Sequence, residues 1–180
     1  MTTILARGRT YPLRAEPFWH LCPRLGGNIL NNAHNGEGIY ASNSATGDVS
    51  FYGFKEAATE KGQVWEAVRA ATNPLAPTRL HAMFLFDDEA VAFRAMTAWF
   101  AGQEHLMLEA RIDRRAKIHR ADAKWLDCGR GDWEGNASRY WRGEMTTDPM
   151  AEIIVEGVVY FPGWRNPPFG IGAVFLPPQP

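Results

Sequence analysis

The stretch that organises the apolar pattern of the chain runs from Asp148 to Tyr160, where an apolar run contains the polar residues Glu152 and Glu156. Val, Ile and Tyr dominate this stretch and Pro162-Gly163 follows it, so the pattern predicts a buried strand. Because side chains alternate between the two faces of a strand, Glu152 shares a face with Met150 and Ile154. An ionised group among apolar residues is costly unless it is compensated, which makes Glu152 a candidate site residue. The same pattern is also typical of an edge strand whose carboxylates face water.

The other apolar runs predict the remaining elements by their period, two for strands and 3.6 for helices. Strands are expected at Phe18–Cys22, Leu80–Phe86, His105–Asp113 and from Ala116 to His119, with an edge strand at Val174–Leu176. Helices are expected at 55–72, at Glu89–Ala101 behind an Asp87 or Asp88 cap, and as short segments at Ala121–Leu126 and Ala137–Tyr140. Residues 1–17 are expected to be irregular, and Leu30–Phe54 a long loop that is either functional or disordered.

Composition narrows the class of protein. The chain has 180 residues, enough for one domain with a core that needs no disulfides. Its 19 Lys and Arg nearly balance 20 Asp and Glu, so no general attraction to nucleic acid or anionic membranes is expected. Cys22 and Cys128 form no Cys-x-x-Cys pair, which argues against a structural metal site. Without a secretory signal or a membrane-spanning apolar run, we expect a cytoplasmic protein that does not bind membranes.

Several polar residues lie where a ligand could reach them. His20 lies on the face of its strand that also carries Phe18 and Cys22, although a core histidine bonded to a backbone carbonyl fits the same pattern. Arg24 follows the end of that strand. Tyr40, in the long loop, either faces a ligand or packs.

The region from Tyr140 to Gly143 is expected to lead from a short helix into a loop. Trp141 and Arg142 could then lie over the same cleft as Glu152. The basic cluster between Arg111 and Lys124 contains acidic neighbours, so a solvated hairpin tip is expected there, with phosphate contact as the alternative.

Common nucleotide and metal motifs are missing from the sequence. The glycines between Cys128 and Asn136 do not have the G-x-G-x-x-G spacing, and no P-loop Lys-Ser/Thr is present. The H-x-E and P-C-x-x-C elements of zinc deaminases are absent as well. Rossmann, P-loop and zinc-deaminase sites are therefore disfavoured.

Four short motifs, in this order and spacing, carry a resemblance to a known family. They are Pro77-Thr78-Arg79-Leu80, Phe84-Leu85-Phe86-Asp87-Asp88, Tyr140-Trp141-Arg142-Gly143 and Glu152-Ile153-Ile154-Val155-Glu156-Gly157, preceded by the aromatic strand Phe18-Trp19-His20. Together they resemble small bacterial and phage domains of the ADP-ribosyltransferase superfamily. The resemblance covers about residues 18–160 of a single domain spanning 1–180. It implies an α+β fold, with split antiparallel β-sheets and flanking helices.

Carried over residue by residue, the resemblance implies an NAD site without a metal. Glu152 matches the catalytic glutamate, and His20 matches the residue that hydrogen-bonds the ribose beside the nicotinamide. Arg79 or Arg24 would hold the NAD phosphates. Either Phe84 or Phe86 lies near the stacked ring.

The match has two departures. The second strand reads Phe-Leu-Phe-Asp where many members have Ser-Thr-Ser, and Met150 occupies the position where many protein-modifying members have Gln or Glu. A target arginine is therefore not implied.

The chemistry that the resemblance implies is cleavage of the bond between ribose and nicotinamide. Positive charge develops on the sugar, so a positioned carboxylate stabilises the transition state more than the ground state. The expected function is an NAD-dependent ADP-ribosyltransferase acting on a protein or nucleic acid in a bacterial or phage-infected cell. An NAD glycohydrolase on the same fold, or a non-catalytic phage or bacterial accessory binding protein, is the alternative.

Overall fold

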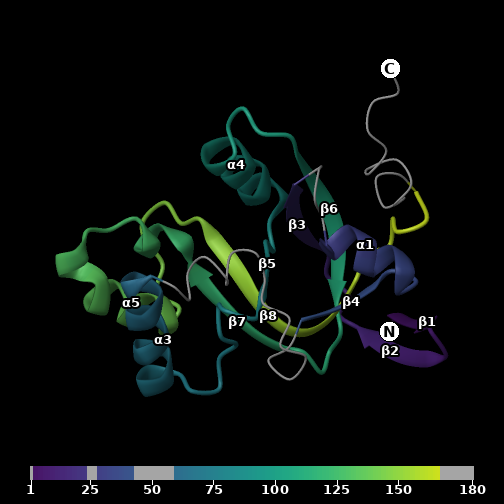
Figure 1. The fold of residues 1–180 in the computed structure, drawn as a ribbon, viewed down its shortest axis with the longest axis horizontal. Helices are drawn as coiled ribbons and strands as arrows, with labels where there is room; N and C mark the ends of the chain where they lie inside the picture. The colour runs from purple at the N-terminus through teal and green to yellow at the C-terminus, as the bar shows by residue number, and fades with distance from the viewer. Residues whose placement is uncertain (1, 24–27, 43–58, 167–180) are drawn as a thin grey trace. The chain divides into compact units, whose positions relative to one another are not determined.

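Helices and antiparallel strands make up the described chain, which comprises residues 2–23, 28–42 and 59–166 of the computed structural model (Figure 1). The mixture of helices with antiparallel sheets agrees with the expected α+β class at that coarse level. Contacts group the chain into two compact units. The first unit comprises Met1–Ala41, Asp87–Arg115 and Val158–Pro180, and the second unit comprises Ser42–Phe86 and Ala116–Gly157. Each unit is described by itself below.

The first unit begins with a hairpin where the sequence predicted irregular structure. Strand β1 (Thr2–Ala6) pairs antiparallel with β2 (Arg9–Leu13) through a two-residue turn. Arg7 and Gly8 both have positive φ, 49° and 72°, as a tight hairpin turn matching the strand twist requires. Such turns are usually marked by Asn-Gly or Asp-Gly, so Arg-Gly did not signal this one.

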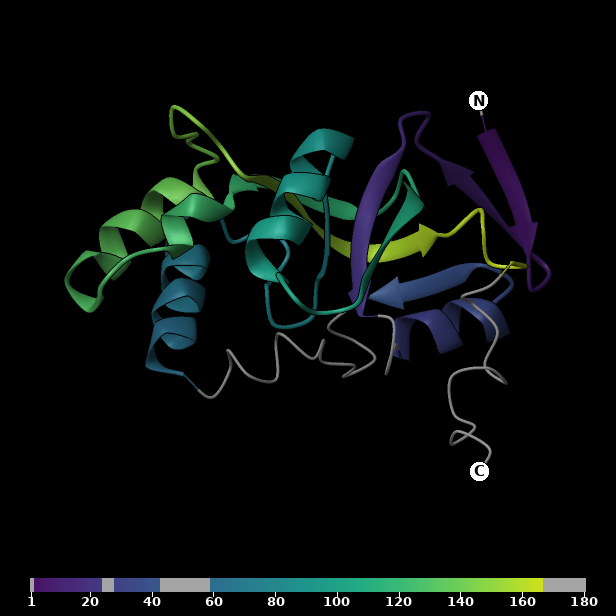
Figure 2. The ribbon, with the colours of Figure 1, turned by 90° about the horizontal axis from the view of Figure 1, so that it is seen from above.

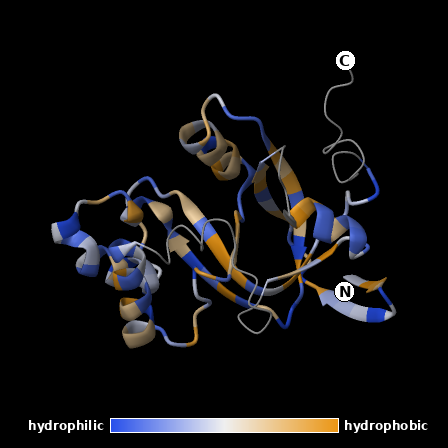
Figure 3. Ribbon diagram, viewed as in Figure 1, coloured by the Kyte–Doolittle hydropathy of each residue, from blue (hydrophilic) through white to orange (hydrophobic). Residues whose placement is uncertain are grey.

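The sheet of the first unit follows the order β3, β6, the end of β8 (Ala151–Tyr160) and β4 (Ile39–Ser42). Strand β3 (Phe18–Pro23) pairs antiparallel with β6 (His105–Ile112), both close to their predicted positions. Helix α4 (Glu89–Trp99) packs against both strands, and the three elements are coloured largely toward the hydrophobic end in Figure 3. The helix begins where Asp88 accepts a hydrogen bond from the Val91 amide, 3.0 Å away, so this aspartate provides the cap.

The expected loop over 30–54 is wrong in its first part. Helix α1 (Asn28–Asn35) and strand β4 (Ile39–Ser42) occupy it, while residues 43–54 lie outside the described chain. Leu30 and Ala33 are buried on one face of α1, and this packing outweighs the poor helix propensity of its asparagines. The predicted strand at Val174–Leu176 also lies outside the described residues.

Strand β8 (Ala151–Tyr160) is the centre of the second unit up to Gly157. It pairs antiparallel with β5 (Met83–Leu85) along one edge and with β7 (Lys117–Asp122) along the other. The edge-strand alternative is therefore wrong, since both edges of β8 are paired at residues 153–155 and Glu152 is buried. The run of buried residues from Ala151 to Val155 reflects that central position.

Two helices close the second unit, and they lie side by side in Figures 1 and 2. Helix α3 (Glu60–Thr72) begins where Thr59 Oγ1 accepts a hydrogen bond from the Gly62 amide at 2.9 Å, and residues 55–58 of the predicted helix lie outside the described chain. Helix α5 (Trp133–Trp141) is longer than predicted, and the short helices η1 (Ala123–Leu126) and η2 (Arg130–Asp132) precede it. The core of this unit consists of Trp65, Ala76, Ala82, Ala121, Ala137, Tyr140, Trp141 and Ile154.

Among the described residues, none of the helices combines the length and the apolar character needed to cross a bilayer.

Candidate functional site

Glu152 lies on the covered face of the sheet in the second unit. The strand register places Ala121 of β7 opposite Glu152, and it places Phe84 of β5 and His119 of β7 on either side of Ile154. Residues two apart on a strand share a face, so Phe84, His119 and Glu152 project to the same side. The sheet thus gathers an aromatic ring, an imidazole and a carboxylate.

The carboxylate of Glu152 is held through one of its two oxygens. Arg79 Nη1 donates a hydrogen bond to Glu152 Oε1 at 2.6 Å, and the Tyr140 hydroxyl donates to the same oxygen at 2.6 Å. Arg79 also donates to the Tyr140 hydroxyl oxygen, so the three polar groups form a closed cluster. Within the described part of the chain, Oε2 of Glu152 accepts no hydrogen bond.

The cluster is almost completely removed from solvent. Arg79 is 7% exposed and Glu152 is 3% exposed. The guanidinium carbon of Arg79 lies 4.6 Å from the centre of the Phe84 ring and 5.1 Å from that of Tyr140. Cation–π contacts of this kind stabilise a desolvated arginine. Two aromatic rings and one carboxylate therefore compensate the buried charge.

A second set of hydrogen bonds, made by side chains of α3, holds the segment that carries Arg79 in place. Glu66 accepts hydrogen bonds from Arg69 Nη2 at 2.6 Å and from Thr78 Oγ1 at 2.9 Å. Arg69 Nη1 in turn donates to the Ala76 carbonyl at 2.9 Å. These contacts attach residues 76–78 to the helix, so the direction in which Arg79 enters the core is set locally.

His119 contacts the C-terminal end of α5. Its Nε2 lies 3.1 Å from the Tyr140 carbonyl oxygen, and its ring is 5.4 Å from that of Trp141. A carbonyl only accepts, so this contact assigns the proton of the neutral ring to Nε2. Burial lowers the pKa of His119, against the opposing effects of the Tyr140 carbonyl and of Glu152, which raise it. The net pKa is below the ordinary value, so the imidazole is neutral at pH 7.

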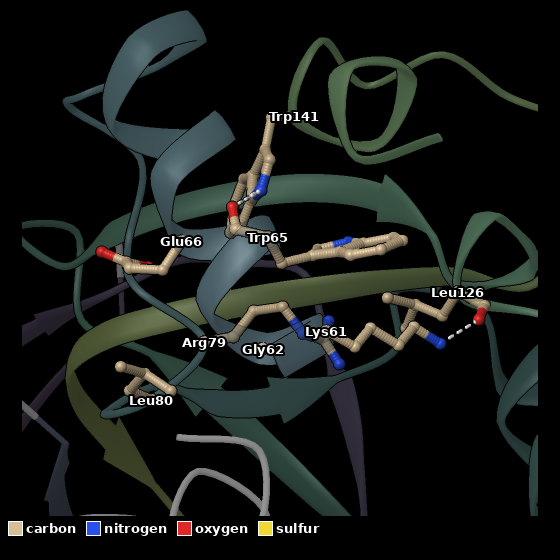
Figure 4. Close-up of a pocket in the computed structure, with 8 residues that line it drawn as sticks. All are labelled: Lys61, Gly62, Trp65, Glu66, Arg79, Leu80, Leu126 and Trp141. Carbon is tan, nitrogen blue, oxygen red and sulfur yellow. Dashed lines mark hydrogen bonds between the residues drawn. The ribbon is translucent and has the colours of Figure 1, made fainter. Parts of the chain in front are cut away.

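A pocket opens beside Arg79, on the α3 side of the cluster (Figure 4). Lys61 crosses it and donates to the Leu126 carbonyl at 2.5 Å, while the Trp141 indole donates to the Trp65 carbonyl at 2.8 Å. The space left for water-sized occupants is about 10 Å³, which is room for about one water molecule. A nicotinamide does not fit this pocket unless its lining moves. The lining residues are Lys61, Gly62, Trp65, Glu66, Arg79, Leu80, Leu126 and Trp141.

The second unit brings together four of the residues singled out from the sequence, namely Glu152, Arg79, Phe84 and Trp141. Trp141 is a core residue, with its indole bonded to the backbone of Trp65. Arg142 instead is exposed and pairs with Glu144 at 3.7 Å.

The other candidate residues lie elsewhere. His20 and Tyr40 belong to the first unit, in β3 and β4; His20 is buried, with its ring edge-on to Phe161 at 6.1 Å, and Tyr40 is half-buried. Phe86 is buried at the end of the β5 segment, and Arg24 lies outside the described residues. The convergence of His20 with Glu152 stays a prediction.

Two residues, Tyr140 in the cluster and His119 beside it, were missed from the sequence. Tyr140 stands in the quoted Tyr-Trp-Arg-Gly motif, but its neighbours were chosen in its place because they were expected in a loop. His119 lies in a predicted strand, where alternation with Lys117 and Ala121 was the available signal for its face. The strand register was needed to place His119 near Glu152, and the packing of α5 was needed to place Tyr140 there.

The basic cluster between Arg111 and Lys124 is largely neutralised by acidic neighbours. Arg111 pairs with Glu109 at 2.6 Å and Arg115 pairs with Asp113 at 2.6 Å in the first unit. In the second unit, Lys117 is 3.6 Å from Glu156 and Lys124 is 2.5 Å from Asp148. These pairs favour a solvated cluster over phosphate contact. The expected hairpin is wrong, because within the described residues β6 and β7 each pair with β8 and not with one another.

The parts of the chain that the structure covers contain neither a grouped set of metal ligands nor an activated Cys22 thiol. Over 2–23, 28–42 and 59–166, no three His, Cys, Asp or Glu side chains are grouped as a metal site. Both cysteines are free, and burial raises the pKa of the Cys22 thiol to about 12, so it stays protonated and unreactive.

The arrangement as a whole presents a carboxylate with one anchored oxygen, flanked by aromatic rings and a neutral imidazole. A scan against protein-family models finds no match for the chain, and a search of curated proteins finds no similar sequence.

Proposed function

We propose that this protein is an NAD-dependent ADP-ribosyltransferase in which Glu152 is the catalytic carboxylate. The observation that carries the proposal is the one-sided anchoring of Glu152: Arg79 and Tyr140 both bind Oε1, and Oε2 takes no hydrogen bond from the described residues. Three of the four motifs behind the family resemblance, those of Arg79, Tyr140 and Glu152, contribute to this cluster. Their convergence supports the proposal.

The free oxygen suits the chemistry. Oε2 of Glu152 would accept a hydrogen bond from the ribose 2′-hydroxyl and face the positive charge that develops at the anomeric carbon. A carboxylate that is already oriented needs no reorganisation during the reaction, and its field is stronger where aromatic walls exclude water. Phe84 and Trp141 provide such walls in the second unit.

The proposal is tested by the release of nicotinamide from NAD. The wild-type protein is incubated with NAD and a cell lysate, and nicotinamide and labelled macromolecules are measured separately. We expect release in the wild type and its loss in Glu152→Gln. The matched control is Glu156→Gln. Glu156 lies four residues after Glu152 on the same face of β8, and its carboxylate pairs with Lys117. If the wild-type protein releases no nicotinamide, with or without lysate, the proposal is contradicted. This outcome does not depend on whether Glu152→Gln folds.

The same experiment separates transfer from hydrolysis. Label that becomes sensitive to protease or to nuclease identifies a protein or a nucleic acid as the acceptor. Free ADP-ribose without labelled macromolecules identifies an NAD glycohydrolase.

A second candidate is a non-catalytic binding protein in which the buried ion pair of Arg79 and Glu152 is purely structural. The burial of Arg79 and Glu152, together with the small pocket beside them, favours this candidate. In that case Glu152→Gln destabilises the fold while NAD is neither cleaved nor bound. Equilibrium dialysis with labelled NAD distinguishes the two candidates.

A further inference from the structure

We propose that His119 is the general base that takes the proton from the attacking nucleophile in the reaction assigned to Glu152. This inference rests on the proposed function and adds the residue that would activate the acceptor. Family resemblance does not point to this position, because none of the quoted motifs contains His119.

The strand register puts His119 within reach of the carboxylate. Ala121 is directly opposite Glu152 and His119 is opposite Ile154, so His119 and Glu152 are diagonal neighbours on one face of an antiparallel pair. Diagonal neighbours are about 7–8 Å apart, a span that long and aromatic side chains bridge.

The hydrogen bonding of His119 leaves the correct nitrogen available. Nε2 carries the proton because it faces the Tyr140 carbonyl at 3.1 Å, so the lone pair of the neutral ring is on Nδ1. Across the described residues, Nδ1 makes no hydrogen bond, and it is not among the fully enclosed unpaired nitrogens. A general base needs this combination of a fixed tautomer and an accessible lone pair.

The surroundings of His119 keep it neutral but able to accept a proton. Burial lowers its pKa, while the Tyr140 carbonyl and the charge of Glu152 on β8 raise it. The other charged groups on this face are the Lys117–Glu156 pair, at the next positions of β7 and β8, and Arg79, which is paired with Glu152. Of these groups, Glu152 is the one whose charge raises the pKa of His119, so it would stabilise the imidazolium formed.

The proposed step balances as follows. The bond between the anomeric carbon and the nicotinamide nitrogen breaks, and its electron pair returns to the pyridinium ring to give neutral nicotinamide. The oxygen or nitrogen of the acceptor forms the new bond to the anomeric carbon. Its proton moves to His119 Nδ1, and the imidazolium later releases it to water.

The test uses a nucleophile that has no proton to lose. His119→Gln keeps a donor for the Tyr140 carbonyl and removes the base, so nicotinamide release with water as acceptor should fall about 100-fold or more. Azide ion should restore release in this variant to within about tenfold of the wild-type rate, because no proton transfer is required. His34→Asn is the control, since His34 Nδ1 also contacts a backbone carbonyl, that of Trp164 at 3.4 Å.

The pH profile gives an independent reading. The wild-type rate should fall as the pH decreases through the pKa of His119, below about 6.5, and His119→Gln should lose that dependence. If His119→Gln does not fold, His119→Asn replaces it in the same assay.

The outcomes separate this inference from the proposed function. A variant that hydrolyses NAD at the wild-type rate, or one that azide does not restore, overturns the role of His119 alone. A wild-type protein that releases no nicotinamide with water or with azide overturns both.

Discussion

Arg79 Nη1 lies 2.6 Å from Glu152 Oε1, although the two residues are 73 positions apart in the chain. Both side chains are buried, at 9% and 5% exposure. Removing one partner of a buried ion pair lowers the stability of a protein more than replacing both partners with apolar residues, because the remaining charge stays in the core without compensation. The pair therefore makes the stability of the second unit depend on both residues together.

Replacing Arg79 with Met should destabilise the protein by about 3–5 kcal/mol, since Glu152 loses its cation inside the core. Adding Glu152→Met should recover most of that loss, because two apolar side chains of similar length leave no unpaired charge. Urea denaturation of both single variants and of the double variant measures the coupling. Additive losses, with the double variant the least stable, would contradict the ion-pair interpretation.

Replacing Tyr140 with Phe should cost about 1.5–3 kcal/mol, the range for a hydrogen bond to a charged group. The phenol both accepts from Arg79 and donates to Glu152 Oε1, and the side chain is fully buried. Thermal and urea unfolding measure the loss. Tyr11→Phe, in the β1–β2 hairpin, is the control and should change stability by less than about 0.5 kcal/mol. Equal losses of stability in the two variants would show that the hydrogen bonds of the Tyr140 hydroxyl do not stabilise the fold.

Local sequence signals predicted the elements that contain long periodic or β-branched runs. Strands β3, β6 and β8 and helix α4 follow the predicted positions to within a few residues. The β1–β2 hairpin was missed because its turn uses Arg7 in a left-handed conformation, and α1 was missed because asparagines obscured its periodicity. Neither element could be recognised without the packing that stabilises it.

The site was accessible from the sequence only in part. A glutamate inside an apolar strand was a sufficient signal to select Glu152, and burial of that residue agrees with the reason for selecting it. Its partners depend on which strands lie beside β8 and on how α5 crosses them, and both are long-range properties. The family resemblance assigned the NAD phosphates to Arg79 or Arg24, and the structure shows that the guanidinium of Arg79 binds the carboxylate of Glu152.

Asp122 should make the stability of the protein depend on acid pH. It is fully buried at the end of β7. Burial on its own would raise its pKa, but hydrogen bonds from Thr146, Lys124 and Met150 outweigh this effect and lower the pKa below the ordinary value. A carboxyl whose pKa is lower in the folded state stabilises the fold above about pH 3.9 and loses that contribution as the pH falls through the folded-state pKa.

Asp122→Asn should therefore be less stable than the wild type at pH 7, and the difference should shrink as the pH falls below about 4. Urea denaturation across pH 3 to 7 measures it, within the range in which both proteins fold. Asp148→Asn serves as the control, because that carboxylate is 67% exposed and pairs with Lys124 at the surface. A difference between wild type and Asp122→Asn that is constant over this pH range would contradict the assignment.

Gly157 is the position in the second unit where a side chain is least tolerable. Its φ of +141° is one that L side chains rarely adopt. A Cβ at this position would lie 2.7 Å from Ala116 Cβ and 2.9 Å from its Cα, so β8 and the start of β7 could not approach as closely as they do. Strain and overlap together predict a loss of about 2–4 kcal/mol for Gly157→Ala.

Gly135→Ala is the opposite case and the matched control. Gly135 lies on the exposed side of α5, and a Cβ there would contact nothing within 4 Å. Alanine in a helix loses less backbone entropy on folding than glycine, so this substitution should stabilise the protein by about 0.5–1 kcal/mol. Chemical denaturation of the two variants compares them directly. If Gly157→Ala is as stable as Gly135→Ala, the close contact between Gly157 and Ala116 does not limit the packing of β8 against β7.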